Sequence, residues 1–104
     1  MTREELLQAI KERLQGTFGT RLRGVVLYGS EARGEATPES DIDLLVLLRG
    51  PVKLGDDLWK IVDVLYPLEL EVLRPLHATP VEESVYQAGE YALYRNARAE
   101  GVNL

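Results

Sequence analysis

The sequence has no cysteine, which excludes disulfide bonds, thiolate zinc sites and cysteine nucleophiles together. It also lacks a long apolar stretch. The longest uninterrupted aliphatic run is Leu44–Leu48, whereas a membrane-spanning helix needs about 20 residues. The N-terminal residues Met1–Glu5 do not contain the apolar segment of a signal peptide. We therefore expect a soluble protein of the cytoplasm.

The amino-acid composition is that of one globular domain. Of the 104 residues, 45% are hydrophobic and 28% are charged, and no repeat, low-complexity tract or linker interrupts residues 1–104. The net charge is −5, with six Lys or Arg against four Asp or Glu in residues 1–34 and six against thirteen in residues 35–104. Because an acidic surface repels phosphate backbones, direct binding to nucleic acid is not expected.

The first half of the chain predicts a helix followed by two strands. Thr2 and Glu5 form a capping-box pattern, and apolar residues then recur at helical spacing as far as Gly16. Residues 24–28 are a short β-branched run typical of a buried strand. Residues 41–48 predict a second strand, and the polar loop between the two strands contains a proline.

The second half predicts a helix, a strand and a final helical region. Apolar residues at three- and four-residue steps indicate an amphipathic helix over 54–66, which Pro67 ends or kinks. Alternation over 68–76 predicts a half-buried third strand. Thr79, Pro80 and Glu82 resemble a helix start, so we expect a discontinuous helix from there to residue 99, with a possible break at Gly89. The order α-β-β-α-β-α indicates an α/β (α+β) fold.

Gly29 and Ser30 follow the first predicted strand, where a helical turn can begin. Backbone N–H groups exposed at such a turn bind anions, and glycine allows a close approach. The Ser30 hydroxyl adds a donor. Arg33 lies three residues later, on the same side of a helical turn, so its guanidinium would reach the same phosphate chain. These residues predict a phosphate site.

Asp41 and Asp43 are separated by one residue on the second predicted strand, so both carboxylates project from one face. Two ionised carboxylates this close repel each other, and a cation between them would offset that repulsion. Hard oxygen ligands without nearby cysteine or histidine select Mg²⁺ or Mn²⁺. A phosphate site beside a two-carboxylate metal site is the layout of metal-assisted phosphoryl or nucleotidyl transfer.

The combined pattern is Gly-Ser, ten intervening residues and Asp-x-Asp, with Ala-Arg-Gly in the gap. It resembles the minimal nucleotidyltransferases of the DNA polymerase β superfamily, and the sharp resemblance covers residues 25–48. The family implies a small mixed β-sheet packed on helices, Mg²⁺-dependent use of a nucleoside triphosphate, and release of pyrophosphate. Many members are antitoxins that accompany a HEPN-domain ribonuclease, and some transfer AMP to a tyrosine of that partner.

The family's third carboxylate usually lies on the third strand between apolar residues. Over 68–76 this chain offers Glu69 and Glu71 and no aspartate. We favour Glu71, because the apolar residues around it fit the family pattern. The longer arm of glutamate would shift the ligand by a methylene, so weak or altered activity is an alternative. The only histidine, His77, is interpreted as a packing or capping residue.

The resulting hypothesis is a Mg²⁺-dependent nucleotidyltransferase that uses ATP. Asp41, Asp43 and Glu71 are expected to hold two Mg²⁺ or Mn²⁺ ions during in-line attack on the α-phosphorus. Gly29, Ser30 and Arg33 are expected to hold the β- and γ-phosphates. By family analogy the acceptor hydroxyl is a tyrosine of a HEPN-type partner, and a second copy of the chain is another way to complete the acceptor site. The alternatives are a non-catalytic antitoxin with a vestigial or regulatory nucleotide site, and a nucleotide-binding domain without transfer activity.

Overall fold

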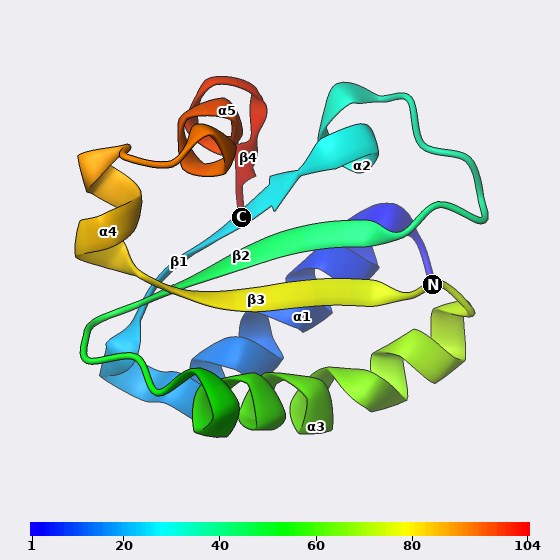
Figure 1. Cartoon of the computed structure of the whole chain (residues 1–104). Coiled ribbons are helices and arrows are strands. Elements are labelled where there is room, and N and C mark those ends of the chain that lie inside the picture. The colour runs from blue at the N-terminus through cyan, green and yellow to red at the C-terminus, as the bar shows by residue number, and fades with distance from the viewer.

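The computed structural model describes all 104 residues as a four-stranded sheet between two pairs of helices (Figure 1). The strand order is β3-β2-β1-β4. β1 (Leu22–Tyr28) pairs antiparallel with β2 (Ile42–Leu48) and with the short β4 (Val102–Asn103). β2 and β3 (Leu76–Glu82) are parallel. The sheet is therefore mixed, as the family resemblance implies.

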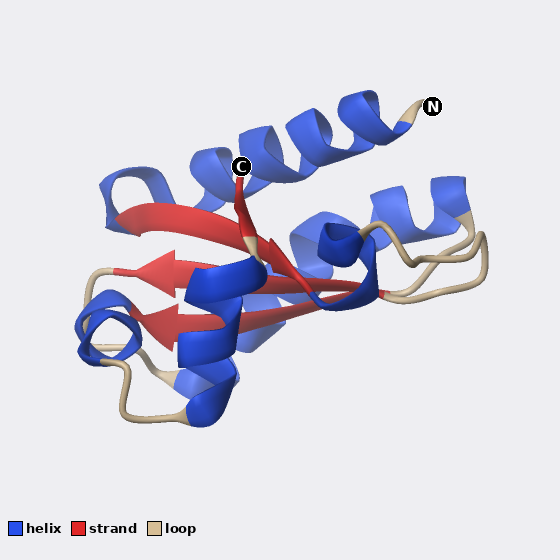
Figure 2. Ribbon diagram, turned by 90° about the horizontal axis from the view of Figure 1, so that it is seen from above, coloured by secondary structure: helices blue, strands red, loops and turns tan.

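The helices divide between the two faces of the sheet. α1 (Arg3–Phe18) and α3 (Leu54–Val72) cover one face, and α4 (Glu83–Ala88) and α5 (Ala92–Glu100) lie on the other (Figure 1). The short helix α2 (Gly29–Arg33) connects β1 to β2 at one end of the sheet, where β2 and β3 begin (Figure 2). None of these helices combines the length and the apolar character that a membrane crossing requires.

The alternation of β2 supplies apolar side chains to both faces of the sheet. The larger cluster combines β2 residues with side chains of α1 and α3, among them Leu6, Ile10, Leu14, Ile42, Leu44, Val46, Leu48, Ile61, Leu65 and Leu68. The smaller cluster, under α4 and α5, consists of Val26, Leu45, Leu47, Val81, Tyr86 and Ala97. The predicted orientation of β2 is confirmed, because the residues that alternate with the two aspartates face α1 and α3. Asp43 therefore projects from the α4 and α5 side.

The predicted start of the first helix is confirmed. The Thr2 hydroxyl accepts the Glu5 N–H, and the Glu5 carboxylate accepts the Thr2 N–H. This reciprocal pair satisfies two N–H groups that a helix start otherwise leaves without partners. The predicted end was wrong, because the helix continues past Gly16 to Phe18 before a 3-10 turn, Gly19–Arg21, leads into β1.

The predicted third strand over 68–76 was wrong. α3 continues through Pro67 as far as Val72. Leu65, Leu68 and Val72 keep the three- and four-residue spacing that turns them onto the main apolar cluster. Pro67 itself is exposed, so water can satisfy the carbonyl that loses its helical donor. Burial of the apolar face therefore outweighs the proline.

The third strand of the fold lies at β3 instead, so the predicted helix start at Thr79 was also wrong. Pro80 is tolerated there because β3 is an edge strand, half of whose N–H groups have no partner strand. The break at Gly89 is confirmed, since this residue ends α4 with φ +66°. The two-residue strand β4 was not predicted, because so short a pairing leaves no sequence pattern.

Candidate functional site

The candidate site lies at the end of the sheet where β1 ends and β2 and β3 begin (Figure 2). Tyr28 of β1 is opposite Asp43 of β2, and Asp43 is beside His77 of β3. Residues opposite one another on neighbouring strands project from the same face of a sheet. The three side chains therefore form a row on the face that α4 and α5 cover further along.

The Gly29-Ser30 turn lies directly beside this row. Gly29 has φ +73°, and a Cβ at this position would lie 2.6 Å from Oδ2 of Asp43. The positive φ favours glycine, and a larger residue would push the Asp43 carboxylate aside. The sequence predicted a phosphate-binding turn beside an acidic pair, and the fold places the turn in contact with one of the two acids.

Asp43 carries a charge that its surroundings disfavour. Burial raises its pKa, and the negative charge of Asp41 acts in the same direction, whereas His77 and Arg33 oppose the rise. Nδ1 of His77 lies 3.4 Å from Oδ2 of Asp41 and 3.8 Å from Oδ1 of Asp43. A cation bound between Asp41 and Asp43 would stabilise both ionised carboxylates.

The two aspartates fit a magnesium ion that arrives with a substrate. No group of three His, Asp or Glu side chains is arranged to hold a metal ion. Magnesium, however, is commonly bound by one or two carboxylates and completes its octahedron with water and substrate phosphates. Asp41 and Asp43 are two such carboxylates, and the Gly29-Ser30 turn lies beside Asp43.

The remaining predicted phosphate ligands belong to α2. The Ser30 hydroxyl makes no hydrogen bond within the chain, and no side chain caps the start of α2. The first N–H groups of α2 are therefore left to water or a ligand. Arg33, at the end of α2, pairs with Glu35 at 3.2 Å, and both side chains are exposed.

A cavity of about 250 Å³ opens between the end of β1, α2 and α5. Its lining consists of Tyr28, Gly29, Arg33, Leu93, Asn96, Ala97 and Glu100. A larger cavity of about 470 Å³ contains none of the predicted site residues. The smaller cavity is therefore the one connected to the candidate site.

Glu71 does not join the two aspartates. It lies exposed on α3 instead of on a strand, because the predicted strand over 68–76 is helical. Glu69, the other candidate, uses its Oε1 to accept the N–H of Leu76 at 2.8 Å. Neither glutamate forms a three-ligand group with Asp41 and Asp43. The predicted role of Glu71 as a third ligand loses its geometric basis.

The position beside Asp43 on the true third strand belongs to His77, which has the apolar neighbours Leu76 and Ala78. The interpretation of His77 as a packing or capping residue was wrong, since its side chain is 61% exposed and lies against Asp41 and Asp43. The sequence contained the required pattern of one polar residue between two apolar ones. This pattern was missed because the predicted strand, 68–76, began eight residues before β3.

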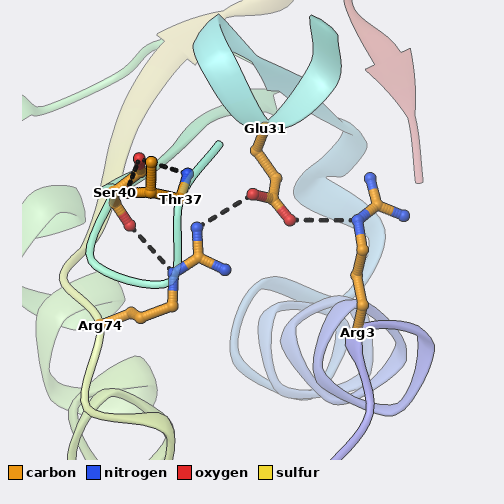
Figure 3. A network of polar contacts seen from close by, with 5 residues as sticks. All are labelled: Arg3, Glu31, Thr37, Ser40 and Arg74. Atoms are coloured by element: carbon orange, nitrogen blue, oxygen red, sulfur yellow. Dashed lines mark hydrogen bonds and ion pairs between the residues drawn. The ribbon is translucent and has the colours of Figure 1, made fainter. Parts of the chain in front are cut away.

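Sequence reasoning also missed Glu31, which lies inside the motif. Its side chain is only 7% exposed and forms ion pairs with Arg3 at 3.1 Å and Arg74 at 2.9 Å (Figure 3). The hydrogen bond from Arg74 is the main reason why the pKa of Glu31 is lowered. The partners lie 28 and 43 residues away along the chain, so no local pattern could have identified them.

Known proteins share this sequence pattern over most of the chain. The profile of the nucleotidyltransferase domain family matches residues 3–89. A protein of Methanocaldococcus jannaschii, provisionally named a protein adenylyltransferase, is 28% identical over 103 residues, which are 97% of this chain and 96% of that protein. A second protein of the same organism with the same provisional name is 39% identical over 59 residues. That match covers 57% of this chain and only 37% of the relative.

Two solved structures share the fold. A crystal structure of a toxin–antitoxin with AMP-PNP matches with a TM-score of 0.68 and 18% identity, over 92% of this chain and 69% of that chain. A crystal structure of a provisionally named nucleotidyltransferase from Sulfolobus solfataricus matches with a TM-score of 0.63 and 20% identity, over 95% of this chain and 76% of that chain. The family profile covers well over half of the residues, and the curated relatives carry the matching activity name. The chain therefore belongs to the nucleotidyltransferase domain family and is a nucleotidyltransferase.

Proposed function

We propose that this nucleotidyltransferase transfers AMP from ATP to a protein hydroxyl and that Mg²⁺ binds between the nucleotide and the two aspartates. The observation that carries the proposal is the close approach of Gly29 to Oδ2 of Asp43. A triphosphate bound at the turn would lie next to Asp41 and Asp43. The names of the M. jannaschii relatives and the AMP-PNP of the structural neighbour favour adenine as the base.

Each residue then has a defined task. The Gly29-Ser30 N–H groups and the Ser30 hydroxyl bind the β- and γ-phosphates. Arg33 turns from Glu35 to the same phosphates, which is feasible because an exposed ion pair is weak. Asp41 and Asp43 hold the metal. When bound, Mg²⁺ neutralises phosphate charge and promotes attack on the α-phosphorus.

His77 occupies the position that the family resemblance assigns to a third carboxylate. Its Nδ1 lies 3.4 Å from Asp41 and 3.8 Å from Asp43, so an imidazole that carries a proton there attracts both carboxylates. An imidazole at this place can also accept the proton of an attacking hydroxyl, a role that histidine serves in many enzymes. We therefore replace Glu71 by His77 in the proposed site.

The acceptor hydroxyl is proposed to belong to a toxin partner in the cytoplasm. The structural neighbour is a toxin–antitoxin structure, and the family resemblance makes a tyrosine of a HEPN-type protein the first choice. A second candidate function is an antitoxin that binds nucleotide without transferring it. The site's having two carboxylates and a histidine, instead of three carboxylates, favours this second candidate.

The decisive experiment incubates the chain with ATP labelled at the α-phosphate, Mg²⁺ and the product of the neighbouring reading frame. We expect label on that partner, release of pyrophosphate, and loss of both with Asp41→Asn or Asp43→Asn. Asp63→Asn, an exposed aspartate of α3, serves as the matched control and keeps full transfer. If no partner is labelled and Asp43→Asn still neutralises the toxin, the second candidate function is correct.

A further inference from the structure

The loop that carries Asp41 into the site is fixed at two points to the turn between α3 and β3. Nε of Arg74 donates a hydrogen bond to the Ser40 carbonyl at 2.9 Å. The Pro75 carbonyl accepts the Ile42 N–H, also at 2.9 Å. Asp41 therefore lies between two residues that are both attached to consecutive positions of the same turn.

Arg74 makes a second contact that reaches the phosphate side of the site. Its Nη2 donates to Oε2 of Glu31 at 2.9 Å, and Glu31 is the residue that follows Ser30 in α2 (Figure 3). One guanidinium thus bridges α2 and the loop before Asp41. Arginine suits this task because its planar group presents donors in fixed directions. The side chain of Glu31 is only 7% exposed and that of Arg74 17%, so water competes little for the pair.

The turn that presents Arg74 has a fixed shape. Leu73 adopts φ +55°, a conformation that non-glycine residues rarely adopt. Glu69 holds the turn on both sides, because its carbonyl accepts the Leu73 N–H at 2.9 Å and its carboxylate accepts the Leu76 N–H at 2.8 Å. The guanidinium of Arg74 therefore starts from a defined backbone position.

We propose that Glu31 and Arg74 are positioning residues that hold the Gly29-Ser30 turn and Asp41 in register for the magnesium nucleotide. This inference rests on the proposed function for the identity of the ligand. Neither side chain is proposed to touch the nucleotide. We call the Glu31–Arg74 pair the clamp. It is needed because one of the parts that it joins, α2, has five residues, and so short a helix is not stable by itself. Most residues of the loop, 34–41, are exposed.

The test compares two variants of the clamp with two controls. Glu31→Gln removes the charge that both arginines share, and Arg74→Lys keeps a charge but replaces the separate Nε and Nη2 donors by a single ammonium group. Arg3→Gln removes the other partner of Glu31 without affecting the loop, since no hydrogen bond links Arg3 to the loop. Asp57→Asn breaks the buried pair with Arg21 at the far end of α3. For each protein, calorimetry gives the Kd of AMP-PNP with Mg²⁺, and amide hydrogen exchange of ligand-free protein gives the protection of residues 34–42.

We expect Glu31→Gln and Arg74→Lys to weaken AMP-PNP binding about tenfold, as lost supporting contacts commonly do. They should also abolish the protection of the Ser40 and Ile42 amides. Arg3→Gln and Asp57→Asn should leave both quantities unchanged at temperatures where every variant is folded. If Glu31→Gln does not fold, Arg74→Lys decides the outcome.

Three results would overturn the inference: unchanged affinity in the clamp variants, lost loop protection without lost affinity, or equal loss of affinity in Asp57→Asn. If the unmodified chain itself does not bind AMP-PNP with Mg²⁺, the proposed function fails. In that case the exchange data still decide whether Glu31 and Arg74 order the loop, and unchanged protection would refute that ordering as well.

Discussion

Asp57 and Asp43 are aspartates at opposite ends of the molecule, and only Asp57 has an arginine partner. Asp57 is 2% exposed and accepts two hydrogen bonds from Arg21, at 3.0 and 3.1 Å, and one from the Lys53 N–H at 3.0 Å. The Arg21 guanidinium lowers its pKa. Asp43, with a partly buried side chain, has no arginine or lysine partner, and burial raises its pKa. One carboxylate is satisfied by the fold, and the other has the features of the proposed ligand site.

The two aspartates therefore affect stability with opposite dependence on pH. The lowered pKa of Asp57 adds stability that is complete above the ordinary aspartate pKa and is lost as the pH falls. Glu31 behaves in the same way. The raised pKa of Asp43 adds stability only at low pH, and this stability is lost as the pH rises through the folded-state pKa. At neutral pH the ionised Asp43 therefore opposes folding.

The largest predicted effect is that of Asp43→Asn. The variant should bind AMP-PNP with Mg²⁺ at least about 100-fold more weakly and should transfer no AMP, because it loses one of the two carboxylates proposed to bind the metal. Its free energy of unfolding at neutral pH should stay the same or rise by about 1 kcal/mol, since an unfavourable charge is removed. Calorimetry and urea denaturation measure the two quantities. A less stable variant that still binds the nucleotide would show that Asp43 is structural.

Asp57→Asn should give the opposite result. Loss of the charged partner of Arg21 should lower the free energy of unfolding by about 2 kcal/mol at pH 7, less than for a fully buried pair because the Arg21 side chain is 28% exposed. The loss should shrink as the pH falls below the ordinary aspartate pKa towards the lowered pKa of the folded protein, which urea denaturation at several pH values would show. Nucleotide affinity should not change, and a large change would mean that the two ends of the molecule are coupled.

Gly29→Ala tests the contact between the turn and Asp43. The new Cβ would meet Oδ2 of Asp43 in a conformation that alanine disfavours. We expect a loss of about 1 kcal/mol of stability and about tenfold weaker binding of AMP-PNP. Gly16→Ala is the matched control, because it lies inside α1 with no atom within 4 Å of the new Cβ. It should raise stability by about 0.5–1 kcal/mol and leave binding unchanged.

The smallest predicted effect is that of Glu71→Gln. An exposed residue outside the site should change stability by less than about 0.5 kcal/mol and should not change the rate of AMP transfer.

His77→Ala, by contrast, should lower that rate at least about tenfold if the imidazole accepts the proton. The transfer assay with labelled ATP compares the two variants directly. Loss of transfer in Glu71→Gln alone would restore Glu71 to the site.

The predictable part of the site lies within one strand–turn–strand segment. Gly29 and Asp43 are close in sequence, and the antiparallel pairing of β1 and β2 brings them together, so the combined motif of the two strand ends indicated their partnership. His77 could not be placed in the same way, because its position depends on where α3 ends. The alternation of leucine and glutamate from Leu68 onward fits a strand as well as a helix, and Pro67 favoured the wrong choice. Only the packing of α3 on the core decides between them.

The features of the whole fold also fall into those that local sequence predicts and those that depend on tertiary contacts. The cap at Thr2, the two faces of β2 and the break at Gly89 follow from local rules and are confirmed. The Glu31–Arg74 pair and the strand β4 depend on tertiary contacts between distant segments. Such contacts are set by the assembled core and leave no periodic signal in the chain.

The central claim is that Asp43 is held in an unfavourable charged state until a magnesium nucleotide binds beside Gly29. The most direct measurement is an NMR titration of the Asp43 side-chain carboxyl carbon, with and without AMP-PNP and Mg²⁺. In the free protein the pKa should lie above that of an ordinary aspartate, and in the complex it should fall below that value. A pKa that is the same in both states would contradict the account.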